Sequence, residues 1–90
     1  MSDELMASLR AHFRESTAER LGEMAVLLDQ LDRDASDTDT RERLGRHFHA
    51  LSGLGATYGY PRVSELGEEG ERTSDPARWR ELVDALARAL

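Results

Sequence analysis

The sequence predicts an all-α fold: an antiparallel up-and-down four-helix bundle with a short extra N-terminal helix. Three observations support this prediction. Every apolar pattern repeats at helical spacing, and none alternates as the residues of a strand would. Pro61 and Pro76 each follow a possible boundary between helices, and proline is typical of the first position of a helix. The segments between the expected helices are short, which favours antiparallel neighbours.

The N-terminal third of the chain contains two helical patterns. The first would begin at Ser2, because the acidic residues that follow it suit a helix N-terminus. Ser16 and Glu19 have the spacing of a capping box, so we expect a second helix to restart there and to end near Asp32. Alternatively, residues 3–33 could form one bent helix. The apolar stripes are Leu5, Met6, Leu9 and Phe13, then Leu21, Met24, Ala25, Leu28 and Leu31.

Three further segments complete the expected fold. Residues 34–40 are polar and turn-rich and predict a loop. A helix should follow from about Thr38 to Tyr58, with Gly59 as its C-terminal cap. The next helix begins at Pro61, and Asp75 is the expected N-cap of the last one. Their inner faces are Val63, Leu66, Gly67 and Gly70, then Trp79, Leu82, Val83, Leu86 and Leu90.

Composition narrows the possible functions. Ninety residues suit one domain, residues 1–90. The absence of cysteine excludes disulfides and cysteine-based metal sites. No apolar run approaches the ~20 residues of a membrane span, and no signal peptide is visible, so we expect a cytoplasmic protein with no membrane partner. The net charge of −6 and the scattered basic residues argue against nucleic-acid binding.

His49 should point away from the core. The buried stripe of its helix is Leu44, Phe48, Leu51, Gly55 and Tyr58. At about 100° per residue, His49 lies roughly 160° around the helix from Leu51. Its neighbours three and four residues away are Gly45, Arg46, Ser52 and Gly53. Three of these are small and one is cationic, which suits an imidazole over which the active site of another protein closes.

Glycine residues lower the stability of this expected helix. Each glycine in a helix interior is less favourable than alanine by roughly 0.5–1 kcal/mol, yet Gly45, Gly53 and Gly55 fall within one expected helix. Small residues also permit close packing of helices. Packing is the favoured interpretation for Gly55, which lies on the core side, and an open surface around His49 is the favoured interpretation for Gly53.

The segment His49-Ala50-Leu51-Ser52-Gly53, with Gly59 ten residues after the histidine, resembles a known family. Histidine-containing phosphotransfer (HPt) domains of two-component phosphorelays share a His-x-Leu-x-Gly core and a second glycine ten positions after the histidine. The resemblance continues through Pro61, Val63, Leu66 and Glu71, and more loosely over most of the chain. It implies that His49 accepts and donates a phosphoryl group from the second helix of a four-helix bundle.

The resemblance also implies roles for other residues. Glu71 stands where a Glu or Gln of the family often hydrogen-bonds the non-phosphorylated ring nitrogen. Many members have a lysine three residues after the histidine, where this chain has Ser52. Arg46, one turn earlier on the same face, is the substitute for its charge, and Ser52 would donate a hydrogen bond to the phosphoryl oxygens. The expected docking patch is Gly45, Arg46, Ser52, Gly53 and Ala56.

The implied partners are the receiver domain of a response regulator and a histidine kinase or hybrid kinase. Transfer of a phosphoryl group requires positioning and neutralisation of charge, usually with a divalent metal. The receiver would supply the aspartate and Mg²⁺, so we expect no cofactor, no metal site and no catalysis of its own in this chain.

Alternatives stay open at this point. The chain could be a phosphorylation-incompetent bundle that acts as a docking scaffold or inhibitor of a kinase or receiver. It could also be the N-terminal phosphoacceptor domain of a chemotaxis-type kinase. A metal- or haem-binding bundle is disfavoured, because the sequence lacks the Glu-x-x-His pairs of such sites. His47 faces roughly 160° away from His49 and should pack at the edge of the core, and His12 has no expected role.

Overall fold

The chain folds into four α-helices in the computed structural model, which describes residues 3–90. They are α1 (Asp3–Arg33), α2 (Thr38–Leu54), α3 (Pro61–Arg72) and α4 (Pro76–Ala89), and a 3₁₀ turn, η1 (Ala56–Tyr58), follows α2. Residues 3–90 contain no strand. The all-α prediction is therefore confirmed. The helix start expected at Ser2 lies outside the described residues.

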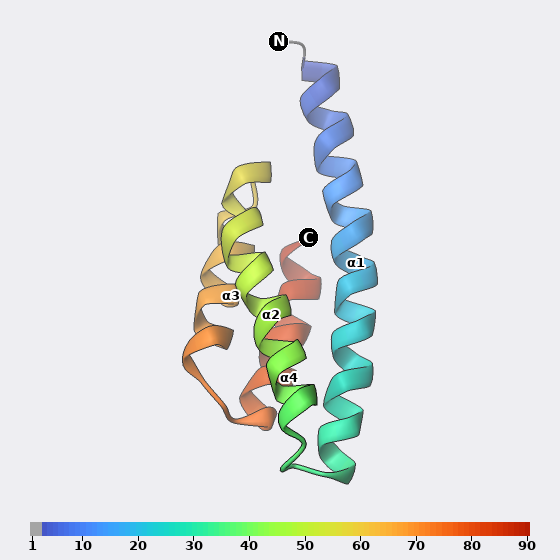
Figure 1. Cartoon of the computed structure of the whole chain (residues 1–90). Helices are drawn as coiled ribbons and strands as arrows, with labels where there is room; N and C mark the ends of the chain where they lie inside the picture. The colour runs from blue at the N-terminus through green and yellow to red at the C-terminus, as the bar shows by residue number, and fades with distance from the viewer. Residues whose placement is uncertain (1–2) are drawn as a thin grey trace.

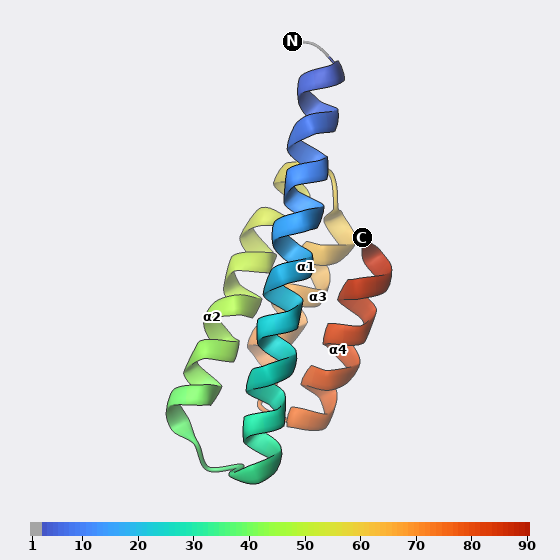
Figure 2. The same ribbon diagram turned by 90° about the vertical axis from the view of Figure 1, so that its right-hand side faces the viewer.

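Successive helices run in alternating directions around one core. In Figure 1, α1 and α3 descend while α2 and α4 ascend, and Figure 2 shows the same arrangement from the side. α2 contacts α1 and α3, and α4 contacts α3 and α1, so the four helices close a ring. The buried core draws side chains from every helix: Phe13, Leu21, Met24, Leu27, Leu28 and Leu31, then Leu44, Phe48 and Leu51, then Val63 and Leu66, then Trp79, Leu82 and Leu86.

The expected short N-terminal helix does not form, because residues 3–33 make one continuous helix. The Ser16 hydroxyl donates to the Phe13 carbonyl at 3.2 Å within that helix, instead of capping a new one. Phe13 is buried, and its ring stacks against those of Tyr58 and Tyr60, which follow α2 in the chain. Leu5 and Leu9 are exposed, because this end of α1 extends beyond the other helices (Figure 1).

Local capping signals set the other helix ends. The Asp37 carboxylate accepts the Thr40 amide at 3.1 Å and caps α2, which begins at Thr38 as expected. The expected helix end at Tyr58 is wrong, because α2 ends at Leu54 and the separate 3₁₀ turn η1 follows it. Gly59 has φ +87°, a left-handed conformation that favours glycine, and it ends η1 instead of the helix that carries His49. The Asp75 carboxylate accepts the Ala77 amide at 3.0 Å and caps α4, which confirms that prediction.

Glycines on α3 allow it to pack very closely against α2. A Cβ atom on Gly67 would lie 2.5 Å from the backbone nitrogen of Ser52, and one on Gly70 would overlap the Phe48 ring. The Trp79 indole of α4 donates to the Gly70 carbonyl at 2.9 Å and holds the other side of α3. This close approach positions residues of α3 beside the outward face of α2.

We predict that Gly67→Ala lowers the free energy of unfolding by about 1–3 kcal/mol, because its Cβ would force the α2 and α3 backbones apart. Gly22→Ala is the matched control. Gly22 lies within α1, where an added Cβ meets nothing within 4 Å, so this change should stabilise the protein by about 0.5–1 kcal/mol. Urea unfolding of both variants measures the difference, and equal stability of Gly67→Ala and the natural protein would contradict the close packing.

Candidate functional site

His49 lies on the outward face of α2, and 78% of its side chain is exposed. Leu44, Phe48 and Leu51 are buried on the opposite side of the same helix. The backbone of α2 therefore holds the imidazole at the surface, while the neighbouring side chains fix the helix in the core.

Glu71 of α3 contacts the His49 ring across the helix interface. Its Oε2 atom lies 3.0 Å from Nδ1 of His49. A carboxylate can only accept, so the proton in this contact is assigned to Nδ1. Nε2 has no hydrogen bond or ion pair with any residue in the range 3–90. In the neutral imidazole, the lone pair of Nε2 is therefore available for a reaction.

The Ser52 hydroxyl lies within reach of the carboxylate of this pair. The pKa of Glu71 is lowered from its ordinary value, first by hydrogen bonding to the Ser52 hydroxyl and then by His49. The hydroxyl hydrogen of Ser52 donates to the His49 carbonyl at 2.8 Å. Because a hydroxyl has a single hydrogen, Ser52 can donate to Glu71 or to a phosphoryl oxygen only by rotating away from this carbonyl. The connection between Ser52 and Glu71 was not expected from the sequence.

The residues beside His49 have small side chains, so little of the surface around the imidazole projects outward. A Cβ atom on Gly45 or Gly53 would meet nothing within 4 Å, so neighbouring helices do not require glycine at these positions. Gly55 differs, because its Cβ would lie 2.6 Å from the backbone nitrogen of Ser64. Ala56 is exposed at the start of η1 and adds little bulk. The packing interpretation thus applies to Gly55 and not to Gly53.

Arg46 is exposed one turn before His49. Its guanidinium group makes no hydrogen bond or ion pair with other side chains in the described part of the chain. It is therefore a cation close to the imidazole whose donors are available to another molecule.

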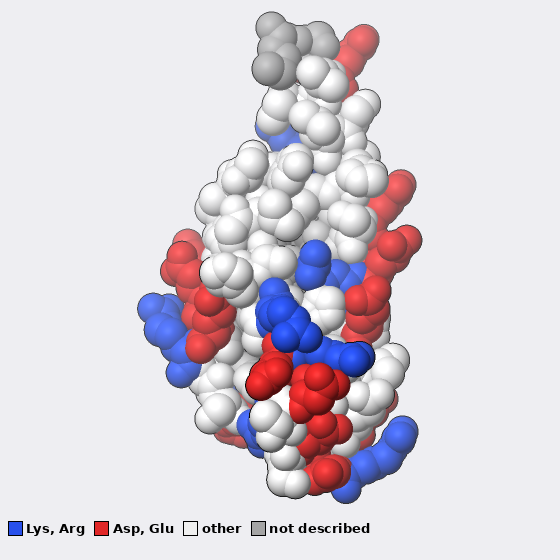
Figure 3. All heavy atoms as spheres, in the orientation of Figure 1, with Lys and Arg blue, Asp and Glu red and all other residues white. Residues whose placement is uncertain are grey.

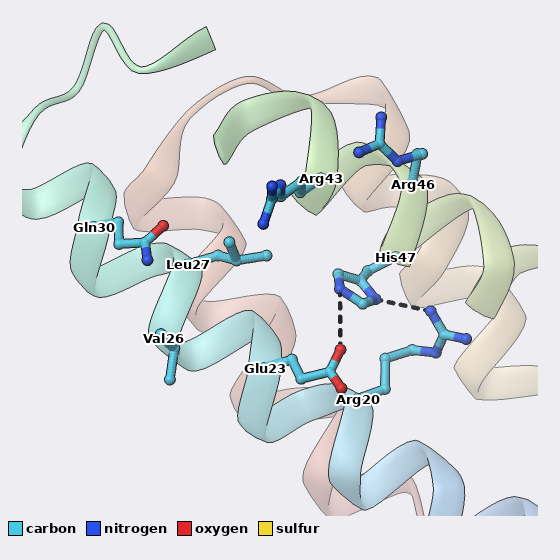
Figure 4. Close-up of a pocket in the computed structure, with 8 residues that line it drawn as sticks. All are labelled: Arg20, Glu23, Val26, Leu27, Gln30, Arg43, Arg46 and His47. Atoms are coloured by element: carbon cyan, nitrogen blue, oxygen red, sulfur yellow. Dashed lines mark hydrogen bonds and ion pairs between the residues drawn. The ribbon is translucent and has the colours of Figure 1, made fainter. Parts of the chain in front are cut away.

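The other two histidines lie away from this site. His47 faces α1, where Nδ1 accepts a hydrogen bond from Arg20 at 2.8 Å and Nε2 lies 3.6 Å from a Glu23 oxygen (Figure 4). Burial, followed by the charge of Arg20, lowers the pKa of His47 from its ordinary value. His12 is exposed on α1. Among residues 3–90, no group of three or more His, Asp or Glu side chains is arranged to hold a metal ion.

The model of the Hpt domain family matches residues 8–90. The chain belongs to the Hpt domain family. Hpt domains are phosphocarrier modules of two-component phosphorelays that interact with kinases and receiver domains and are generally not catalytic.

Comparisons of this Hpt domain with curated proteins and with solved structures found no match. Among the described residues, no helix combines the length and apolar character that crossing a membrane requires.

We predict that His47 makes the stability of the domain sensitive to acid. Its pKa is lower in the folded than in the unfolded chain, so the unfolded chain binds more protons as the pH falls below the ordinary value of 6.5. The stability that neutral His47 contributes at neutral pH should therefore be lost as the pH falls from the ordinary value of 6.5 through the lower pKa of the folded chain. In urea unfolding, the natural protein should lose stability relative to His47→Gln over this range. A constant difference between the two proteins would contradict the prediction.

Proposed function

We propose that the protein reversibly carries a phosphoryl group on Nε2 of His49. It would exchange this group with a histidine kinase or hybrid kinase on one side and with the aspartate of a response-regulator receiver domain on the other. One observation supports the proposal most strongly: the exposed imidazole has Nδ1 bound to the Glu71 carboxylate and Nε2 without a partner among residues 3–90.

The chemistry follows from this geometry. The Nε2 lone pair attacks the phosphorus of the partner's aspartyl phosphate, in line with the carboxylate that leaves. A nitrogen–phosphorus bond forms as the phosphorus–oxygen bond breaks, and the aspartate departs with the bonding electron pair. The positive charge gained by the ring is stabilised by the Glu71 carboxylate through the Nδ1 proton. No proton has to leave the ring, so the reverse reaction uses the same arrangement.

The partner completes the site. Arg46 would interact with the charge of the phosphoryl group from one turn away, and the Ser52 hydroxyl would donate to a phosphoryl oxygen after rotating from the His49 carbonyl. We expect the Mg²⁺ that transfer requires to be bound by the receiver domain. Because Gly45, Gly53 and Ala56 have little or no side chain, the active site of a receiver domain can approach the imidazole closely.

We predict that phosphoramidate labels His49 in the isolated protein and that His49→Gln abolishes this labelling. Glu71→Gln should slow labelling by about 10–100-fold, because the amide no longer stabilises the charged ring. Intact mass and peptide mapping over time measure both effects. Absence of labelling, or equal labelling of His12, His47 and His49, would contradict the proposal and favour a docking scaffold that is not phosphorylated.

We also predict opposite effects of Gly53→Gln on stability and on transfer. The added side chain meets no neighbour and removes a glycine from a helix, so it should stabilise the protein by about 0.5–1 kcal/mol. The same side chain would stand beside His49 and obstruct a receiver domain. Phosphotransfer to a receiver should slow about tenfold or more, while phosphoramidate labelling stays close to that of the natural protein. Undiminished transfer to the receiver would show that this surface is not covered by the partner.

A further inference from the structure

A basic hollow lies between α1 and α2, next to the candidate site. It has a volume of about 580 Å³ and opens to solvent. Its walls include Arg20, Val26 and Leu27 of α1 and Arg43, Arg46 and His47 of α2. Figure 4 shows Arg43 reaching from α2 toward Leu27, while His47 holds Arg20 at the wall through the hydrogen bond described above. We call this feature the α1–α2 hollow.

The charge of the hollow is opposite to that of the chain. Three guanidinium groups and a single carboxylate, that of Glu23, line it, although the whole chain has a net charge of −6. Figure 3 shows arginine side chains gathered in the middle of this face over α2 and the adjoining part of α1, with acidic side chains on both sides and directly below them. Such a local patch attracts an anionic group against the sign of the overall charge.

Arg46 and Arg43 can each bind an incoming anion with little loss of folding free energy. Arg46 has no hydrogen bond or ion pair within the described part of the chain. Arg43 pairs at 3.0 Å with Asp39 on its own helix, but both side chains are more than half exposed. Exposed ion pairs of this kind contribute only about 0–1 kcal/mol. An incoming carboxylate can therefore replace Asp39 without a large loss of stability.

The hollow also offers apolar surface. Val26 is 57% exposed at its edge, and Leu27 is buried beneath it. Small-molecule sites usually enclose most of their ligand, which a hollow this open cannot do. A protein surface that presents an acidic side chain next to an apolar one satisfies both the guanidinium groups and Val26.

Arg46 connects the hollow to the phosphoacceptor. At about 100° per residue, Arg46 lies roughly 60° around α2 from His49 on one side and roughly 60° from Arg43 on the other. Arg43 and His49 thus lie roughly 120° apart on α2 with Arg46 between them, and all three are exposed, so a protein that contacts both must span this arc of the helix. We propose that the α1–α2 hollow binds an acidic side chain, flanked by an apolar one, of the receiver domain that docks over His49. This inference rests on the proposed function.

The test uses the receiver domains encoded in the same genome as this chain. A receiver domain that accepts the phosphoryl group from His49 serves as the probe. The rate of phosphoryl transfer is measured as a function of the concentration of that receiver. Arg43→Glu removes the central cation of the hollow. Arg88→Glu is the matched control, because it changes the net charge equally on α4, a helix that contributes no residue to the walls of the hollow. Val26→Ser removes the apolar contact without changing charge.

Arg43→Glu should raise the receiver concentration that gives half the maximal rate by about tenfold or more, with the maximal rate little changed. Val26→Ser should raise it by about threefold, and Arg88→Glu by less than about twofold. Phosphoramidate should label His49 in every variant as in the natural protein, which shows that the fold and the acceptor are intact.

Equal effects of Arg43→Glu and Arg88→Glu would mean that only net charge matters and would overturn the proposal. So would an unchanged concentration dependence in both Arg43→Glu and Val26→Ser. If phosphoramidate labels His49 but no receiver domain takes the phosphoryl group, the proposed function is wrong and the role of the hollow falls with it. If a receiver does take it, the proposed function stands whatever the fate of the hollow.

Discussion

The contact between Glu71 and Nδ1 of His49 depends on how closely α3 packs against α2. Two side chains from different helices meet at 3.0 Å on the surface, and the distance between the helix axes is set beneath them in the core. Gly67 leaves room for the backbone of α2, and Gly70 leaves room for the Phe48 ring. A longer side chain at either position would push α3 outward and separate the carboxylate from the imidazole. The chemistry at the surface is therefore a consequence of packing in the core.

The domain orients one nitrogen atom and leaves the space around it open. The pKa of Glu71 is lowered from its ordinary value, so the carboxylate keeps its charge and its hold on Nδ1. Gly45 and Gly53 occupy two of the four flanking positions on the face of His49 and leave space beside the ring, and Arg46 is the one long side chain among the four. Such a site suits a phosphocarrier, since the groups that accelerate the transfer can arrive with each partner and leave again.

Features that depend on a few neighbouring residues could be predicted from the sequence. The apolar spacing located α2, α3 and α4, Asp75 marked the start of α4, and Gly59 marked the end of the turn after α2, because caps act within one turn. The local signal misled at Ser16, whose spacing to Glu19 fits a capping box but whose hydroxyl bonds back to Phe13 in an unbroken helix. A capping box and a continuous helix can have the same residues at these positions, and only the backbone conformation at Ser16 distinguishes them.

Features that depend on how helices face each other could not be predicted. The sequence alone does not distinguish Gly67, which is required by a neighbouring backbone, from Gly53, which touches nothing. The proximity of the Ser52 hydroxyl to Glu71 depends on how α3 is oriented against α2. The α1–α2 hollow combines Arg20 and Arg43, which are far apart in the chain. Each of these depends on the packing of the helices and leaves no local pattern.

The most direct test of this account is long-range ¹H–¹⁵N NMR of the His49 ring at neutral pH, before and after phosphorylation with phosphoramidate. The account predicts that the neutral ring carries its proton on Nδ1 and that the phosphoryl group bonds to Nε2, with the Nδ1 proton retained. In Glu71→Gln, the preference for the Nδ1–H form should weaken. A neutral ring protonated mainly on Nε2, or a phosphoryl group on Nδ1, would contradict the role assigned to Glu71.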